Sequence, residues 1–238
     1  MYDLIYSHNY LQDVMMKKYP DSIGTVILIG CLALAVAGYF IGSINFSIII
    51  SKVFFKDDIR THGSGNAGST NMLRTHGTAS GLITFFLDGL KAVAAVVLGA
   101  YVYNLPGTYV AGLFCIIGHI FPVFFKFKGG KGVATVAFII AFTNLTTFII
   151  CLSAFLITVI ISKYVSLGSI IAVALYPPVL FIVLKMSNAQ NMEYVGVIFA
   201  FIIALIVILK HRTNIIKLSE HRESKISFSK HGTDGNKE

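Results

Sequence analysis

Apolar stretches long enough to cross a membrane recur along this chain of 238 residues. A helix needs roughly 20 apolar residues to span the hydrocarbon core of a bilayer. The mean hydropathy is +0.77 and only 13% of the residues are charged, whereas about 25% are charged in a soluble domain. Glycine is frequent (21) and proline scarce (5), which fits helices packed through small residues. The sequence therefore predicts an all-α, polytopic integral membrane bundle.

The apolar runs predict seven transmembrane helices, over residues 22–55, 79–103, 107–125, 131–143, 145–162, 166–186 and 192–210. The first is too long for one straight crossing of a ~30 Å core at about 1.5 Å per residue. We expect it to bend near Gly42-Ser43 or to project beyond the bilayer. Residues 22–210 form one expected transmembrane domain between a polar N-terminal tail (1–21) and a polar C-terminal tail (211–238), disordered beyond about Phe228.

Lys and Arg are distributed unevenly between the connecting segments. If the N-terminus lies outside, fifteen of the 19 Lys and Arg fall in cytoplasmic segments, at 52–78, 126–131, 163 and 210–238. The external loops 104–106 and 187–191 hold none. This is the positive-inside pattern, and six helices would export the basic tail. We therefore expect a cytoplasmic C-terminus, with the net charge of +8 facing anionic lipids and substrates and not nucleic acid.

A polar, glycine-rich loop separates the first two apolar runs. It matches G-x-G-x-x-G, but a dinucleotide site would need a preceding strand, and here an apolar run precedes it. Glycines still let backbone N–H groups converge on an anion. We expect Thr70 or Asn71 to cap a short helix that carries Arg74 toward a phosphate. The candidate ligands are Gly63, Ser64, Gly65, Asn66, Gly68, Thr70, Asn71 and Arg74.

A second glycine loop begins the fourth predicted helix, where N–H groups and the helix dipole favour an anion. It is not a Walker A loop, because Phe125 stands where a glycine is required. An anchor for the inner face would explain the lysines but not the glycines. The candidate ligands are Lys128, Gly129, Gly130, Lys131, Gly132 and Thr135. We expect the two loops to come together as a cage for two phosphate groups.

Other polar residues are weaker candidates when taken singly. Asp88 and Lys91 lie three apart within the second apolar run, and they are either a structural ion pair or functional intramembrane charges. His211 and Asn214 follow the last predicted helix, on the side of the two loops. The three cysteines are scattered through apolar runs, and their spacing predicts neither a metal site nor a disulfide.

Taken together, these motifs resemble the bacterial acyl-phosphate:glycerol-3-phosphate acyltransferase family. The matching stretches, in chain order, are Gly42-Ser43-Ile44, Asp58-Ile59-Arg60 with Gly63-Ser64-Gly65-Asn66, Asp88-x-x-Lys91, Gly118-His119, Gly129-Gly130-Lys131-Gly132, Ser166-Leu167-x-Ser169 and His211-Arg212-x-Asn214. The ordered set covers most of the chain and is specific, although each motif alone is weak.

The resemblance implies acyl transfer from acyl phosphate to the 1-hydroxyl of glycerol 3-phosphate, giving 1-acylglycerol 3-phosphate and phosphate. It implies a site that faces the cytoplasm, with membrane lipids around the protein and no cofactor, metal, acyl-CoA or acyl carrier protein required. The catalytic residues that it implies are Ser64, Arg74, Lys131, His211 and Asn214. The general base stays open between His211 and the departing phosphate.

Two other classes of function fit parts of the sequence. A transporter for a phosphorylated solute would use the intramembrane charges and the anion sites near helix ends, but the two loops share one face and no inverted repeat is evident. A non-catalytic membrane scaffold would leave both glycine loops without a purpose.

Overall fold

Every regular element in the described part of the chain is a helix, as predicted. The computed structural model describes residues 17–18, 22–188 and 194–226. The longer helices are α3 (Ile23–Ser43), α4 (Phe46–Ile50), α5 (Ser69–Ile120), α6 (Val133–Thr143), α7 (Leu145–Ser162), α8 (Val165–Met186), α9 (Val195–Lys210) and α10 (Arg212–Ser219). A π-helical turn at Ser51–Phe55 and 3-10 turns at Ile59–Thr61 and Val123–Phe125 complete them. The predicted disorder beyond Phe228 and most of the N-terminal tail lie outside the described residues.

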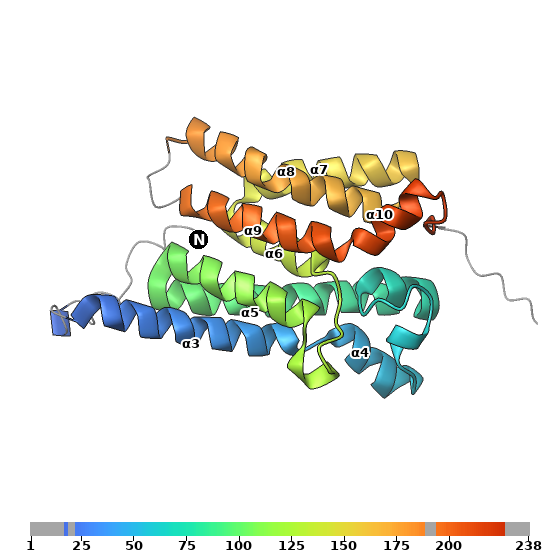
Figure 1. Cartoon of the computed structure of the whole chain (residues 1–238), viewed down its shortest axis with the longest axis horizontal. Helices are drawn as coiled ribbons and strands as arrows, with labels where there is room; N and C mark the ends of the chain where they lie inside the picture. The colour runs from blue at the N-terminus through green and yellow to red at the C-terminus, as the bar shows by residue number, and fades with distance from the viewer. Residues whose placement is uncertain (1–16, 19–21, 189–193, 227–238) are drawn as a thin grey trace, which may run out of the picture.

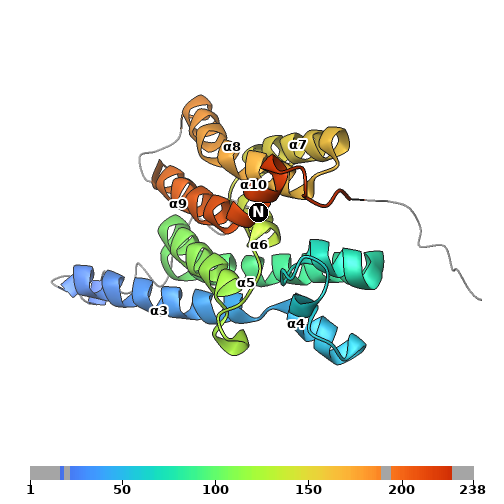
Figure 2. The same cartoon turned by 45° about the vertical axis from the view of Figure 1, so that its right-hand side comes forward.

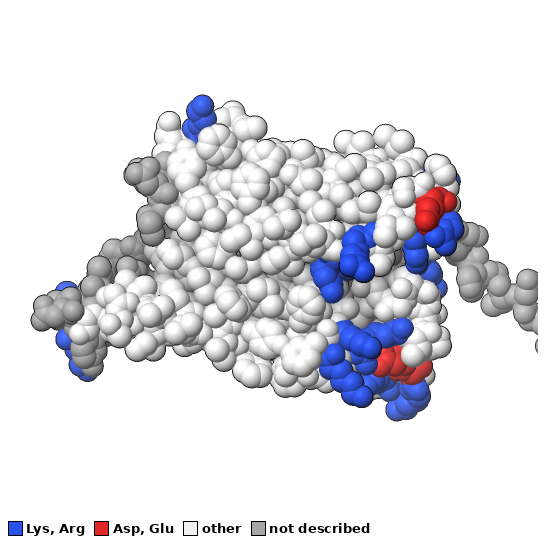
Figure 3. Space-filling model, viewed as in Figure 1, with Lys and Arg blue, Asp and Glu red and all other residues white. Residues whose placement is uncertain are grey.

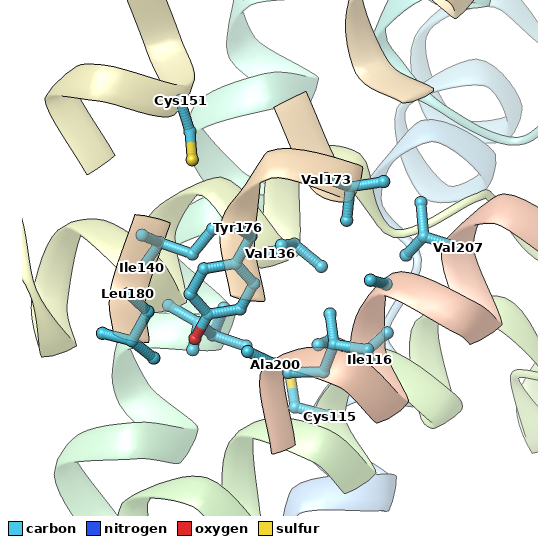
Figure 4. Packing of buried hydrophobic residues seen from close by; sticks show 14 of the residues in the cluster. Cys115, Ile116, Val136, Ile140, Cys151, Val173, Tyr176, Leu180, Ala200 and Val207 are labelled. Atoms are coloured by element: carbon cyan, nitrogen blue, oxygen red, sulfur yellow. The ribbon is translucent and has the colours of Figure 1, made fainter. Parts of the chain in front are cut away.

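The helices form two layers that run along the long axis of the molecule (Figure 1). One layer holds α3 and α5, the other holds α7, α8 and α9, and α6 lies between them in both views (Figures 1 and 2). The buried core follows this arrangement (Figure 4), because α5, α6, α8 and α9 all contribute to one apolar cluster. Its members include Val96, Ile116, Val136, Ile139, Ile140, Val173, Tyr176, Leu180, Ile203 and Val207.

The first predicted helix bends where expected. Helix α3 ends at Ser43, and the backbone is extended at Ile44 and Asn45 before α4 begins. The Asn45 side chain caps α4, because its Oδ1 accepts from the Ile48 N–H at 3.1 Å. The break lies beside the first glycine loop, because Asn45 Nδ2 donates to the carbonyl oxygen of Ala67 at 3.4 Å.

Helix α5 contains the second and third predicted helices as two antiparallel arms. The backbone leaves helical geometry at Tyr103 and Asn104, where the chain reverses. Gly99 and Gly107 then face each other so closely that a Cβ on either would collide with the carbonyl oxygen of the other. A separate break at Gly77 (φ 86°) sets off the short segment that carries Arg74.

Helix α3 packs closely on the second arm of α5 through small residues. A Cβ at Gly42 would collide with the carbonyl oxygen of Cys115, and one at Gly38 would lie 2.5 Å from that of Ala111. Membrane helices approach in this way because van der Waals contact replaces the hydrophobic driving force in lipid. The contact fixes the loop after α3 relative to the loop after α5.

Four helical segments in the described residues are long and apolar enough to span a bilayer, at Gly24–Phe55, Ser69–Phe125, Leu145–Ser162 and Val165–Met186. Helices α9 and α10, bent by 56° at their junction, form a fifth candidate. The count of seven crossings and the orientation stay predictions. Most of the Lys and Arg side chains in this view gather at one end of the molecule, beyond a broad uncharged band, and a few lie at the opposite end (Figure 3).

Candidate active site

A cavity of about 600 Å³ opens at this charged end of the bundle. Both glycine loops, the end of α9, α10 and the segment after α10 form its walls. Its lining residues are Gly63, Ser64, Gly65, Asn66, Arg74, Gly129, Gly130, Lys131, Leu209, Lys210, Arg212, Thr213, Asn214, Lys217, Glu223 and Ser224. The two predicted anion loops therefore share one cavity, as expected.

Asn71 holds the first glycine loop from behind. Its Oδ1 accepts from the backbone N–H of Ser64 at 2.9 Å, and its Nδ2 donates to the carbonyl oxygens of Ile59 (3.1 Å) and His62 (2.9 Å). The prediction that Thr70 or Asn71 caps this helix is wrong. The helix begins at Ser69 with Gly68 as its N-cap, so Asn71 lies inside the first turn and reaches back to the loop.

The second glycine loop folds against the end of α5. The N–H of Gly129 donates to Ile120 O at 3.2 Å and that of Gly130 to His119 O at 3.1 Å. A Cβ at Gly130 would collide with the His119 ring and would lie 2.5 Å from the carbonyl oxygen of Ala67. Only glycine allows the two loops to touch at this point.

Arg60 also joins the two loops. Its Nη1 donates to Phe125 O at 2.8 Å and to Lys128 O at 3.2 Å, while Nη2 pairs with Asp58 Oδ2 at 2.7 Å. Hydrogen bonding from Arg60 lowers the pKa of the Asp58 carboxyl from 3.8 to about 2. A charged fork that satisfies two carbonyls and one carboxylate fixes the geometry of both segments.

A chain of hydrogen bonds crosses the cavity from the second loop to α8. Lys131 Nζ donates to Asn214 Oδ1 at 2.5 Å, and Asn214 Nδ2 donates to Glu223 Oε1 at 2.8 Å. The same Glu223 oxygen accepts from Ser166 Oγ at 2.9 Å. Lys131 and Asn214, which lie far apart in the sequence, are thus presented to the cavity as one unit.

Burial lowers the pKa of Lys131 from 10.5 to about 8. The positive charges of Lys217 and Arg74 act in the same direction, and the negative charge of Glu223 opposes them. A cavity wall with this excess of positive charge favours a ligand that carries several negative charges.

The family model for glycerol-3-phosphate acyltransferase matches residues 32–221 of this chain. The chain belongs to the glycerol-3-phosphate acyltransferase family. The glycerol-3-phosphate acyltransferase of Finegoldia magna is 41% identical over 195 residues, which cover 82% of this chain and 96% of that protein. That of Mycoplasma mobile is 41% identical over 224 residues, covering 84% and 93%.

The fold of this chain also matches that of a solved structure from the same family. The crystal structure of PlsY (YgiH), an integral membrane glycerol 3-phosphate acyltransferase in its glycerol 3-phosphate form, is 32% identical and superposes with a TM-score of 0.74. The match covers 83% of this chain and 96% of that one. The acyltransferase family suggested by the motifs is therefore confirmed, and the chain is a membrane-embedded acyltransferase.

The predicted catalytic residues and loop ligands fall into two groups in the structure. Nine of them line the cavity; outside its lining lie Gly68, Thr70, Asn71, Lys128, Gly132, Thr135 and His211. Lys128 contributes its carbonyl to Arg60, and its side chain is exposed. His211 is buried, and its Nδ1 lies 2.8 Å from Val207 O. Gly132 (φ 84°) is the N-cap of α6, a backbone role that no side-chain pattern reveals.

Several lining residues were not among the predicted ligands of this acyltransferase. Lys210, Arg212 and Lys217 add three positive charges, and Glu223 supplies the carboxylate that holds Asn214. The run of basic residues after the last apolar stretch was the available signal, and the positive-inside pattern accounted for it without any site. Within the described residues, no group of three or more His, Cys, Asp or Glu side chains is placed to hold a metal ion.

Proposed function

We propose that this protein transfers a fatty acyl group from an acyl phosphate to the 1-hydroxyl of sn-glycerol 3-phosphate. The products are 1-acylglycerol 3-phosphate and inorganic phosphate, in the first acylation step of phospholipid synthesis. The supporting observation is the pairing of two glycine loops and five basic side chains, Arg74, Lys131, Lys210, Arg212 and Lys217, around one cavity. This arrangement suits two phosphate groups held side by side.

The reaction needs orientation and charge stabilisation more than strong acid catalysis, because phosphate is a good leaving group. The 1-hydroxyl oxygen attacks the acyl carbon, forming the ester C–O bond while the bond from that carbon to the phosphate oxygen breaks. Ser64, Arg74, Lys131 and Asn214 offer donors to the phosphates and to the developing oxyanion.

The proton of the 1-hydroxyl moves to the departing phosphate in this scheme. The burial of His211 and its position outside the cavity lining support phosphate over imidazole as the acceptor. His211 then supports the cavity wall from within, since its ring contacts the last turn of α9. The positive-inside pattern supports a cavity that faces the cytoplasm in the cell membrane.

Purified protein incubated with palmitoyl phosphate and glycerol 3-phosphate in the presence of a chelator tests the proposal. We expect 1-acylglycerol 3-phosphate and phosphate in equal amounts. Parallel reactions replace the donor with palmitoyl-CoA or palmitoyl-acyl carrier protein. Product formation from a thioester and none from palmitoyl phosphate would overturn the proposed donor.

A further inference from the structure

Three polar side chains lie buried beneath the point where the two glycine loops meet. Lys91 Nζ pairs with Asp88 Oδ1 at 2.7 Å and lies 3.0 Å from His119 Nδ1. Lys91 is 6% exposed, Asp88 1% and His119 3%. Charged groups inside a membrane bundle are costly and usually have a functional or structural partner. None of the three lines the cavity, so they do not touch the reactants.

The Asp88–Lys91 pair holds the break between α3 and α4. Lys91 Nζ donates to the carbonyl oxygen of Ile44, and the backbone N–H of Phe46 donates to Asp88 Oδ1 at 3.5 Å. Asn45, between these two residues, is fully buried and donates through Nδ2 to Ala67 O at 3.4 Å. The ion pair is therefore connected to the first glycine loop through residues 44–46.

His119 connects the same cluster to the second glycine loop. Its carbonyl oxygen accepts from the Gly130 N–H at 3.1 Å, and its ring fills the space where a Gly130 side chain would lie. Lys91 Nζ lies 3.0 Å from Nδ1 of this imidazole, whereas the added Gly130 Cβ would meet the other ring nitrogen, Nε2. One ammonium thus contacts two segments that lead separately to the two loops.

We propose that Asp88, Lys91 and His119 are positioning residues that set the two glycine loops against each other for acyl transfer. This inference rests on the proposed function of the cavity. If Asp88 and Lys91 served stability alone, the ion pair between them would be enough. Here the donors and acceptors of the pair are directed at the backbone of residues 44 and 46 and at the imidazole beneath Gly130.

The test separates the loss of a buried charge from the loss of positioning. Lys91→Met leaves the buried Asp88 carboxylate without its ammonium partner, with His119 Nδ1 at 3.6 Å as its remaining ion-pair contact, and folding suffers. Asp88→Asn with Lys91→Met removes both charges but also removes the donor to Ile44 and His119. We expect the double variant to regain the wild-type melting temperature, measured by calorimetry on the full-length protein in detergent.

Although stability recovers, we expect kcat/KM of the double variant for glycerol 3-phosphate to stay about 10- to 100-fold below wild type, because the reactants are misplaced relative to each other. Thr143→Val is the matched control, because among the described residues this buried hydroxyl bonds only to Ile139 O and Ile140 O of its own helix, α6. It should leave both kcat and KM unchanged. A double variant that regains stability and kinetic constants together would overturn the positioning role.

Equilibrium binding of radiolabelled glycerol 3-phosphate without any acyl donor keeps this inference separate from the proposed donor. If wild type binds the label and the double variant binds at least tenfold more weakly, the positioning role holds even where palmitoyl phosphate proves inactive. Equal binding by the two proteins, both folded, would overturn it.

Discussion

Lys131 and Asn214, 83 positions apart in the sequence, share a hydrogen bond of 2.5 Å across the cavity. The bond joins the second glycine loop to α10 and uses one of the three donors of the ammonium. Asn214 is itself held by Glu223, so its carbonyl oxygen is directed at Lys131. Within the part of the chain that the structure describes, Lys131 makes no second side-chain hydrogen bond, so two donors are available to an anion in the cavity.

Lys131→Met should lower kcat/KM for glycerol 3-phosphate by about 10- to 100-fold. A charge-assisted hydrogen bond contributes about 1.5–3 kcal/mol, and each 1.36 kcal/mol in the barrier is about tenfold in rate. Steady-state kinetics with palmitoyl phosphate measures the effect. Lys185→Met removes an exposed charge outside the cavity lining and should leave kcat/KM unchanged. A fully active Lys131→Met enzyme would contradict the role of this ammonium.

The KM for glycerol 3-phosphate should rise as the pH passes upward through about 8. Burial lowers the pKa of Lys131 to about 8, so the side chain loses its charge above that pH and attracts a phosphate dianion less. Arg stays protonated to beyond pH about 12. Lys131→Arg should therefore remove the alkaline rise in KM, and a variant with the wild-type pH profile would exclude Lys131 as its source.

The lowered pKa of Lys131 also affects stability: as the pH rises, substrate affinity falls but the free energy of unfolding increases. The unfolded chain, with Lys131 near its ordinary pKa of 10.5, binds more protons than the native state between about pH 8 and 10.5. The contribution of this group to the free energy of unfolding therefore increases with pH over that window. Melting temperatures of wild type and Lys131→Met across this range isolate the contribution.

The sequence predicted the helices and the two loops but not the connections between them. The length of an apolar run predicts a membrane helix, and glycine among small polar residues indicates an anion-binding loop, so both signals are local in the sequence. The roles of Asn71 and Glu223 depend on contacts between distant segments: Asn71 reaches back to Ile59 and His62, and Glu223 meets Ser166 of α8. Such partners follow from tertiary packing, which one sequence does not reveal.

The basic residues of α10 show a different limit. Lys217 and Arg212 line the cavity, yet a general rule for membrane topology already explained basic residues after the last apolar run. One local pattern can satisfy two physical requirements at once. The structure distinguishes the two roles. The 56° bend between α9 and α10 turns α10 across the cavity, so that Lys217 lines the cavity instead of facing lipid headgroups.

Arg60→Met should lower the free energy of unfolding by about 1.5–3 kcal/mol, since it removes charge-assisted bonds to Phe125 O, Lys128 O and Asp58. Because the pKa of Asp58 is held near 2, the stabilisation is present above pH 3.8, its ordinary value, and is lost as the pH falls through about 2. Calorimetry at several pH values measures both effects.

Lys52→Met is the matched control for Arg60. Lys52 Nζ lies 3.9 Å from Asp58 Oδ2 and its side chain is 53% exposed, so its removal should cost no more than about 1 kcal/mol. Equal losses in the two variants would show that Arg60 acts through the charge of Asp58 alone and not through its bonds to the second loop.

Gly132→Ala should destabilise the start of α6 and weaken glycerol 3-phosphate binding together. Gly132 has φ 84°, a region that costs a residue with a Cβ about 1–2 kcal/mol, and its added Cβ would lie 3.3 Å from Ile116 Cγ2. Relief of this strain would move the adjacent Lys131 away from Asn214. Gly24→Ala is the matched control, because a Cβ at Gly24 meets nothing within 4 Å and α3 accepts alanine. Calorimetry and binding of labelled glycerol 3-phosphate should separate the two variants, and wild-type binding by a folded Gly132→Ala protein would show that the turn at Gly132 does not set the position of Lys131.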